Sequence, residues 1–325
     1  MRTAYAIGLD VGGTRIAAGL VERKGRIVRE TKVLTPKASG PFAIVDAVVD
    51  AIAEVTQNVH PSEIAGIGIG LPAQIDFTKQ TVEFCTNLPL GGVDMRGLVT
   101  SRAKFPVTID NDGHTAAIAE WRFGAAKGLK DFVMVTLGTG VGGGVFVDGR
   151  PYRGFRGFGG EIGHMVVQLD GELCPCGGRG HLEAYAARPA IIRDALAAVK
   201  TFRGSGIRRL ANDVPEKITA EVVIQAARSG DEAAIEIMNR VGDVLGEAMV
   251  GLVNLLNPQA IIVGGGIGES SPLVIERASA RIQSEALAGR RDVRVLPAEL
   301  GNDAGLVGAA ALAFDEHDSR EGMHR

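Results

Sequence analysis

The stretch AYAIGLDVGGTRIAAGLVE, residues 4–22, sets the expectation for the fold. Its apolar residues predict a buried strand over 4–10, and VGGT at 11–14 predicts a tight turn. A returning strand is predicted over 15–22. The sequence therefore predicts that the chain begins with a β-hairpin meander whose glycines lie at the first bend.

The second half of the chain repeats this plan. Strand 131–137 leads into the glycine-rich turn GTGVGGG at 138–144, and a returning strand is predicted over 145–152. Hairpins followed by alternating helices and strands predict an α/β fold with mixed sheets flanked by helices. The other predicted elements are strands at 27–35, 64–73, 105–110, 259–266 and 292–298, helices at 41–59, 96–104, 111–124, 188–202, 219–229, 231–256, 272–288 and 303–316, and a frayed polar tail at 317–325.

The chain of 325 residues is long enough to form two lobes. We place the boundary where strand 105–110 gives way to a helix. This divides the chain into a smaller lobe over 1–112 and a larger lobe over 113–302. The closing helix at 303–316 is expected to return to the first lobe.

The composition is that of an ordinary globular chain, with 46% hydrophobic and 22% charged residues. A net charge of −3 gives no electrostatic reason to expect nucleic acid or an anionic membrane as a partner. No apolar run reaches the ~20 residues that span a bilayer, and the N-terminus lacks the apolar segment of a signal peptide. Three cysteines, two of them in a Cys-x-Cys motif, argue against a disulfide framework, so we expect a cytoplasmic location.

The stretch GGEIGHMVVQLDGELCPCGGRGHLE, residues 159–183, concentrates potential ligands between glycine-rich turns. Two carboxylates, Glu161 and Glu183, flank these ligands, and a metal that folds the loop would position them. The alternative is a glycine-rich loop with two reduced cysteines and unrelated histidines. We favour a tetrahedral zinc site of the Cys2His2 type, formed by His164, Cys174, Cys176 and His181.

Three glycine motifs are candidates for binding a nucleotide. In the first, Asp10-Val-Gly12-Gly13-Thr14, backbone amides and a hydroxyl can converge on phosphate oxygens while the carboxylate holds hydrated Mg²⁺. Its alternative is a plain hairpin turn. The second, 138–144, has five glycines in seven residues, more than a hairpin needs, although a bulged loop is the alternative. The third, Gly264-Gly265-Gly266, follows a predicted strand and, together with Asn302-Asp-Ala-Gly305, would let a nucleobase lie against bare backbone.

The segment Asp110-Asn111-Asp112 stands where a buried strand gives way to a helix. Asp112 is a candidate general base for a substrate hydroxyl, which Asn111 would position. The alternative is that Asp112 only caps the helix. His114, one turn into that helix, is interpreted as a structural histidine with satisfied hydrogen bonds.

Taken together, these motifs resemble the ROK (repressor, open reading frame, kinase) family, with its bacterial glucokinases in particular. The resemblance covers about residues 4–315. It implies an actin-like ATPase fold, in which two ribonuclease-H-like lobes bind ATP and a hexose. The matching motifs, in order, are Asp10–Thr14, Asn111-Asp112, Leu137–Gly144, Glu161–His164, Cys174-Pro175-Cys176-Gly177, Leu182-Glu183 and Val263–Gly266.

The resemblance also implies roles for individual residues. Asp112 would be the catalytic base that takes the proton from the sugar hydroxyl, usually the one on C6. Mg²⁺ would neutralise phosphate charge, and the zinc would be structural. The sugar would be bound by Asn87, Asn111, Asp112, Glu161, His164 and Glu183. The phosphates would lie on Asp10, Gly12, Gly13, Thr14, Gly138 and Thr139, and the adenosine near Gly264, Gly265 and Gly266.

Two positions depart from the family pattern. The family's zinc loop usually reads C-x-C-G-x-x-G-C, and here His181 stands where the third cysteine is expected. A Cys2His2 set still binds zinc, although an imidazole reaches farther than a thiolate and is neutral. The family's usual G-x-P-G motif reads Gly70-Leu-Pro-Ala73 here. This difference bears on which sugar is bound more than on which reaction is catalysed.

The resulting expectation is an ATP-dependent glucokinase that works as a homodimer or homotetramer. Fructose, mannose, allose or an N-acetylhexosamine as substrate, and polyphosphate as donor, remain alternatives. A sugar-responsive regulator of the same family is a further alternative. Only nine residues precede Asp10, so we expect no helix-turn-helix module and disfavour the regulator.

Overall fold

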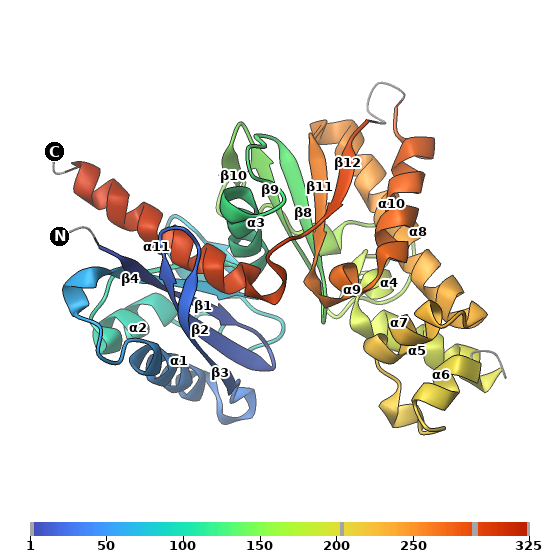
Figure 1. Cartoon of the computed structure of the whole chain (residues 1–325), viewed down its shortest axis with the longest axis horizontal. Helices are drawn as coiled ribbons and strands as arrows, with labels where there is room; N and C mark the ends of the chain where they lie inside the picture. The colour runs from blue at the N-terminus through green and yellow to red at the C-terminus, as the bar shows by residue number, and fades with distance from the viewer. Residues whose placement is uncertain (1–2, 202–204, 288–291, 324–325) are drawn as a thin grey trace. The chain divides into compact units, whose positions relative to one another are not determined.

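The computed structural model describes residues 3–201, 205–287 and 292–323. The chain forms two compact units (Figure 1). The first consists of residues 1–128, 144–160 and 302–325, and the second of residues 129–143 and 161–301. This division differs from the predicted boundary at residue 112, because the helix after that residue packs on the C-terminal helix in the first unit.

The first unit is built on a five-stranded sheet with the order β3-β2-β1-β4-β7. The predicted hairpin meander forms its antiparallel half, and β1, β4 and β7 run parallel to one another. A separate two-stranded sheet pairs β5 with β6. The strands are β1 (Tyr5–Val11), β2 (Arg15–Glu22), β3 (Ile27–Leu34), β4 (Ile64–Leu71), β5 (Gln74–Asp76), β6 (Thr81–Phe84) and β7 (Val107–Asn111).

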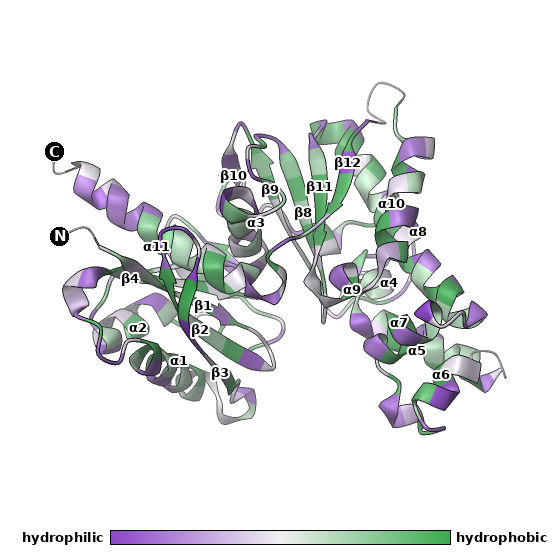
Figure 2. Cartoon of the chain, viewed as in Figure 1, coloured by the Kyte–Doolittle hydropathy of each residue, from purple (hydrophilic) through white to green (hydrophobic). Residues whose placement is uncertain are grey.

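Helices cover both faces of this sheet. Side chains alternate along a strand, so Ile7 and Leu9 join the core with the first helix pair while Gly8 faces the C-terminal helix. The first pair is α1 (Pro41–Val55) and α2 (Met95–Ala103), and the second is α3 (Asp112–Phe123) and α11 (Ala304–Met323). In Figure 2, hydrophobic colour covers the first part of α11 and hydrophilic colour its last turns.

The second sheet has the order β10-β9-β8-β11-β12, in which β8, β11 and β12 are parallel. Its strands are β8 (Phe132–Leu137), β9 (Val141–Val147), β10 (Arg150–Tyr152), β11 (Ala260–Gly264) and β12 (Arg294–Pro297). The helices of the second unit are α4 (Glu183–Ala186), α5 (Arg188–Lys200), α6 (Ser205–Leu210), α7 (Ala220–Arg228), α8 (Glu232–Leu256), α9 (Gly265–Ser270) and α10 (Pro272–Glu285).

Two predicted elements need correction. The turn over 138–144 is shorter than predicted, because β9 begins at Val141 and its glycines serve close packing. A Cβ on Gly144, for example, would lie 2.6 Å from the Cβ of Ala117. The C-terminal tail does not fray at residue 317 but continues α11 to Met323, where Asp318 accepts hydrogen bonds of 2.8 and 2.9 Å from Arg23.

The predicted helix ends at residues 202 and 288 lie outside the described residues. Within the described ranges, no helix is both long enough and apolar enough to cross a lipid bilayer.

Glycines on the first sheet allow the backbone of α11 to approach the strands closely. A Cβ added at Gly8 would lie 2.0 Å from the carbonyl oxygen of Leu306, and one at Gly68 would lie 1.8 Å from that of Ala309. Real Cβ atoms do not approach an oxygen this closely, so the helix would have to move away from the sheet.

We therefore predict that Gly68→Ala lowers the free energy of unfolding by roughly 1–3 kcal/mol, the usual cost of overpacking a core. Denaturant unfolding checks this. The control is Gly322→Ala near the end of α11, where an added Cβ meets nothing within 4 Å. That variant should be neutral or slightly stabilising, because alanine favours a helix over glycine. Equal stability of the two variants would contradict the tight contact.

Candidate active site and metal cluster

The glycine turn after β1 is tied down on both sides. The backbone N–H of Gly12 donates to the carbonyl of Arg15 at 2.9 Å, which closes the hairpin. Thr35, after β3, donates through its hydroxyl to the carbonyl of Gly12 at 2.7 Å and through its N–H to the carbonyl of Thr14 at 3.0 Å. Asn87 is exposed next to this turn, since a Cβ on Gly13 would lie 3.8 Å from the Asn87 Cβ. The turn therefore has a defined shape before any ligand binds.

Asp10 lies at the end of β1, where its carboxylate is partly buried. Gly305, in the first turn of α11, packs against it, since a Cβ there would lie 2.9 Å from an Asp10 carboxylate oxygen. Burial removes water from around this group and raises the pKa of Asp10 to about 6. A cation or a set of donors at this position would favour the charged form.

The parallel strands bring Asp10 and the segment after β7 to one edge of the sheet. Asp10 is paired in register with Gly70 of β4, and Gly70 is paired with Asp110 of β7. Strands lie about 4.8 Å apart in a sheet, so these two carboxylate-bearing positions are separated by two strand spacings, about 10 Å. The predicted phosphate turn and the predicted catalytic segment thus belong to one edge in the first unit.

Asn111, not Asp112, caps helix α3. The Asn111 side-chain oxygen accepts hydrogen bonds from the N–H groups of Gly113 and His114 at 2.8 and 3.3 Å, and its Nδ2 donates to the carbonyl of Ala73 at 3.2 Å. Asp112 is the first helical residue and is partly exposed. Its carboxylate lies at the helix N-terminus, where the helix dipole favours negative charge. The capping alternative for Asp112 is therefore wrong, and one of its carboxylate oxygens accepts a hydrogen bond from the N–H of Gly113 at 2.8 Å.

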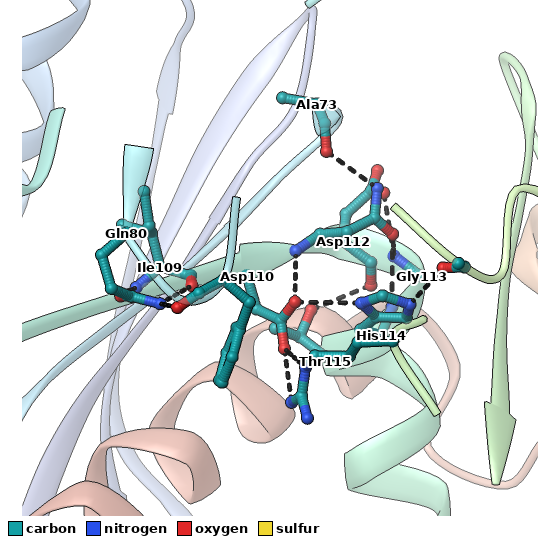
Figure 3. Close-up of polar contacts among 12 residues, drawn as sticks. Ala73, Gln80, Ile109, Asp110, Asp112, Gly113, His114 and Thr115 are labelled. Carbon is teal, nitrogen blue, oxygen red and sulfur yellow. Dashed lines mark hydrogen bonds and ion pairs between the residues drawn. The ribbon is translucent and has the colours of Figure 1, made fainter. Parts of the chain in front are cut away.

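A buried charged network lies beneath this segment. His114 is 2% exposed and Asp110 is 1% exposed. The His114 Nδ1 lies 3.0 Å from an Asp110 carboxylate oxygen (Figure 3). Its Nε2 lies 2.8 Å from the carbonyl oxygen of Gly159. Arg153 donates two hydrogen bonds to the other Asp110 oxygen, at 3.0 and 2.7 Å.

The network lowers the pKa of Asp110. Burial alone would raise this pKa, but His114 and Arg153 outweigh burial and hold the pKa below its usual range. Each ring nitrogen of His114 lies within hydrogen-bond distance of an oxygen, so the ring is held at both ends. The interpretation of His114 as a structural, satisfied histidine is confirmed. The partner that the sequence reasoning missed is Arg153, and nothing near it in the sequence signals the contact.

The second unit holds the other glycine loop. The N–H of Gly138 donates to the carbonyl of Gly140 at 2.9 Å, and the N–H of Val141 donates to the Glu183 carboxylate at 2.9 Å. Gly265, at the start of α9, has φ +76°, and a Cβ there would lie 2.5 Å from the carbonyl oxygen of Leu137. The predicted glycine turn after β11 differs in the structure, because its Gly265 and Gly266 are the first residues of α9. This segment packs directly on the end of β8, next to the loop that carries Gly138 and Thr139.

The predicted metal ligands gather at one point in the second unit. One donor atom from each of His164, Cys174, Cys176 and His181 lies within 4.8 Å of all the others. The Cys174 Sγ lies 3.7 Å from the His164 Nδ1, and the Cys176 Sγ lies 3.2 Å from the His181 Nδ1. Ligand bonds to tetrahedral zinc place a sulfur and a nitrogen about 3.6 Å apart. Both measured separations are near this value, so the donor set is suited to a single metal ion.

The flanking carboxylates lie beside this cluster. Glu161 approaches the other ring nitrogen of His164 at 4.0 Å, and a Glu183 oxygen lies 3.8 Å from the Cys174 Sγ. Burial is the largest cause that raises the pKa of the Cys174 thiol to about 11. A divalent metal held here would favour the thiolate, so its binding would release that proton and depend on pH.

The two units thus hold separate sets of predicted site residues. The first unit contains Asp10, Gly12, Gly13, Thr14, Asn87, Asn111 and Asp112. The second contains Gly138, Thr139, Glu161, His164, Cys174, Cys176, His181, Glu183, Gly264, Gly265 and Gly266.

Comparison with known proteins agrees with this fold. A glucokinase from Streptomyces griseus, whose crystal structure is in complex with glucose and AMPPNP, superposes with a TM-score of 0.87 at 35% identity, over 96% of this chain and 99% of that one. The fold is the actin-like ATPase fold, built from mixed sheets flanked by helices.

The family assignment is equally direct. The ROK family model matches residues 6–316. The glucokinase of Streptomyces coelicolor is 36% identical over 94% of this chain and 96% of its own length, and that of Thermotoga maritima is 34% identical over the same shares. The chain belongs to the ROK family.

The raised pKa of Asp10 predicts a pH-dependent stability difference. A folded-state pKa near 6, above the ordinary value of 3.8, means that stability from the protonated group is lost as the pH rises through 6. Asn cannot ionise, so Asp10→Asn should be more stable than the wild type at pH 7.5 by roughly 1–3 kcal/mol. The difference should shrink below pH 6 and vanish near pH 4. Thermal unfolding of both proteins across this range measures it, and a difference that does not change with pH would contradict the assignment.

Proposed function

We propose that this chain is an ATP-dependent glucokinase that transfers the γ-phosphoryl group of ATP to the C6 hydroxyl of glucose. The observation that carries the proposal is the capped N-terminus of α3, where Asn111 is held by Ala73 and Asp112 follows it. A fixed carboxylate at the end of a parallel strand is suited to orient an alcohol nucleophile. Membership of the ROK family, and relatives that are glucokinases, support the same reaction.

The first unit would supply the base and part of the phosphate site. Asp112 accepts the proton of the attacking hydroxyl, and Asn87 and Asn111 hydrogen-bond the sugar. Gly12, Gly13 and Thr14 bind phosphate oxygens, and Asp10 holds hydrated Mg²⁺, which neutralises phosphate charge when bound. The pKa of Asp10 fits this role, because a nearby cation would favour its ionised form.

The second unit would supply the rest. Glu161, His164 and Glu183 bind sugar hydroxyls, Gly138 and Thr139 lie on the phosphates, and the turn over 264–266 lies near the adenosine. Since phosphoryl transfer needs little covalent chemistry from the protein, positioning and charge neutralisation supply most of the rate enhancement.

The metal cluster would hold a structural Zn²⁺. Two thiolates and two imidazoles are a common zinc donor set, and four protein ligands leave no open position for catalysis. The ion would fix the loop between Glu161 and Glu183 and thereby the spacing of two sugar-binding carboxylates.

Assembly and location are also proposals. Leu255 at the end of α8 is 77% exposed and Leu287 is 62% exposed, which supports a contact in a homodimer or homotetramer. Light scattering of the purified protein tests the assembly. The three cysteines are free thiols, as expected in a reducing cytoplasm.

The sugar and the donor are open to direct test. Ala73, whose carbonyl holds Asn111, stands where the family usually has glycine, so another hexose is the leading alternative to glucose. An assay of ADP release across glucose, fructose, mannose, allose and N-acetylhexosamines, repeated with polyphosphate for sugar phosphate formation, ranks them. If kcat/KM is highest for a sugar other than glucose, the proposed reaction type would stand and the proposed substrate would be wrong.

We predict that Asp112→Asn lowers kcat by about 10²–10⁴-fold, because the amide cannot take the proton of the sugar hydroxyl. Glucose binding, measured by calorimetry, should change little, because an amide keeps the hydrogen-bonding shape. Asp50→Asn, on the exposed side of α1, is the matched control and should turn over normally. Near-normal turnover of the Asp112 variant would contradict the assignment of Asp112 as the catalytic base.

Elemental analysis should find about one zinc per chain. His181→Ala should lose the metal and weaken glucose binding together, while His181→Cys should keep the metal because thiolate is also a zinc ligand. His60→Ala, which removes an imidazole far along the sequence from this loop, should leave both properties unchanged. Full zinc content in the His181→Ala variant would place His181 outside the ligand set.

A further inference from the structure

Arg188, the first residue of α5, lies where two predicted nucleotide segments of the second unit meet. Its backbone N–H donates to the carbonyl of Gly138 at 2.9 Å. Its guanidinium lies over the turn after β11, since a Cβ on Gly266 would be 2.9 Å from the Arg188 Nη2. The two segments are themselves in contact through Gly265 and Leu137. One cation therefore adjoins both the glycine loop and the glycine turn.

The contacts that the Arg188 side chain makes within the protein contribute little to the stability of the fold, so they do not explain why the side chain lies here. Its Nη2 lies 3.0 Å from a carboxylate oxygen of Glu221, but the two side chains are 40% and 58% exposed. Exposed pairs of this kind contribute little to stability. In the part of the chain that the structure describes, the Arg188 Nε is the one buried side-chain nitrogen or oxygen without a hydrogen-bond partner. An unsatisfied buried donor is a cost to the folded protein.

A bound phosphate group would explain both the unpartnered Nε of Arg188 and its exposed pairing with Glu221. A guanidinium presents its Nε and one terminal nitrogen as a planar fork that matches two oxygens of a phosphate. After a rotation of the side chain that exposes the buried Nε, an anion at this edge would give Nε an acceptor and would replace Glu221 as the partner of Nη2. Gly266 has no side chain, which lets the guanidinium pack directly against the backbone of this segment. In the free protein, Glu221 then serves as the counter-ion that keeps the guanidinium in place.

We infer that Arg188 is a nucleotide-binding residue whose guanidinium contacts the diphosphate of the adenine nucleotide. The inference rests on the proposed function, which places phosphates on Gly138 and adenosine near 264–266. It adds a residue that lies outside the glycine motifs and selects for the charge of the nucleotide. In this role, Arg188 helps to bind the nucleotide before the reaction and takes no part in proton transfer.

The decisive variant is Arg188→Met, which removes the charge and keeps an apolar stem. Titration calorimetry with adenosine, AMP and ADP should show ADP affinity lower by about tenfold to a hundredfold, the range of one or two charge-assisted hydrogen bonds. Adenosine affinity and the KM for glucose should stay within about twofold. Arg281→Met is the matched control, because Arg281 forms a similarly exposed pair with Glu247 at 2.9 Å elsewhere in the second unit.

Glu221→Gln provides the second arm. Release of the guanidinium from its protein partner should tighten ADP binding several-fold and make it weaken more steeply with added salt. If Arg188 and Glu221 only join α5 to α7, both variants should lose thermal stability alike and Glu221→Gln should not improve ADP binding. That result would overturn the inference.

Two further outcomes would also overturn it. Unchanged ADP affinity in Arg188→Met would exclude the contact, and an equal loss for adenosine and ADP would move the contact from the phosphates to the nucleoside. Failure of the proposed function is distinguishable, because the wild type would then neither bind ADP nor phosphorylate a hexose. A wild type that does both, with an unaffected Arg188→Met variant, would reject the arginine contact alone.

Discussion

The close approach of backbone to backbone, made possible by glycine, is the constraint on which the first unit depends. Gly8 and Gly68 allow α11 to lie directly on β1 and β4. That position puts Gly305, in the first turn of α11, against the carboxylate of Asp10 and removes water from it. A contact that holds the C-terminal helix on the sheet therefore also sets the electrostatics of the proposed Mg²⁺ ligand.

A second constraint is the charged network under α3. Asp110 is ionised and buried, which is tolerable only because His114 and Arg153 supply donors and positive charge. Removal of one partner would leave an uncompensated charge in the core. The same network connects the start of α3 to Gly159, which stands two residues before Glu161 in the sequence. The proposed base thus lies on a helix whose first turn is held by two contacts. The Asn111 side chain caps its N–H groups, and Asp110 contacts the ring of His114.

The sequence predicted the elements whose signals are local. Both hairpins and most helices follow from periodicity and glycine placement. The cluster of four potential metal ligands follows from ligand spacing within about 25 residues. Contacts between distant segments could not be read this way. Arg153 and Asp110 are 43 residues apart, and Arg188 meets Gly266 across a longer gap. The glycines of β9 misled the prediction because a glycine that admits a neighbouring chain looks the same in sequence as one that makes a turn.

Glu183 shows how the second unit joins its metal cluster to its glycine loop. One carboxylate oxygen accepts from the N–H of Val141, and the other lies 3.8 Å from the Cys174 Sγ. A zinc ion that draws Cys174 into its shell would keep its charge near Glu183, and Glu183 in turn holds the end of the loop that carries Gly138. Arg188 holds the same loop from its other side. A structural metal at this cluster would therefore influence phosphate binding at a distance, because the loop proposed to bind phosphate is held by Glu183, which lies beside the proposed metal ligand Cys174.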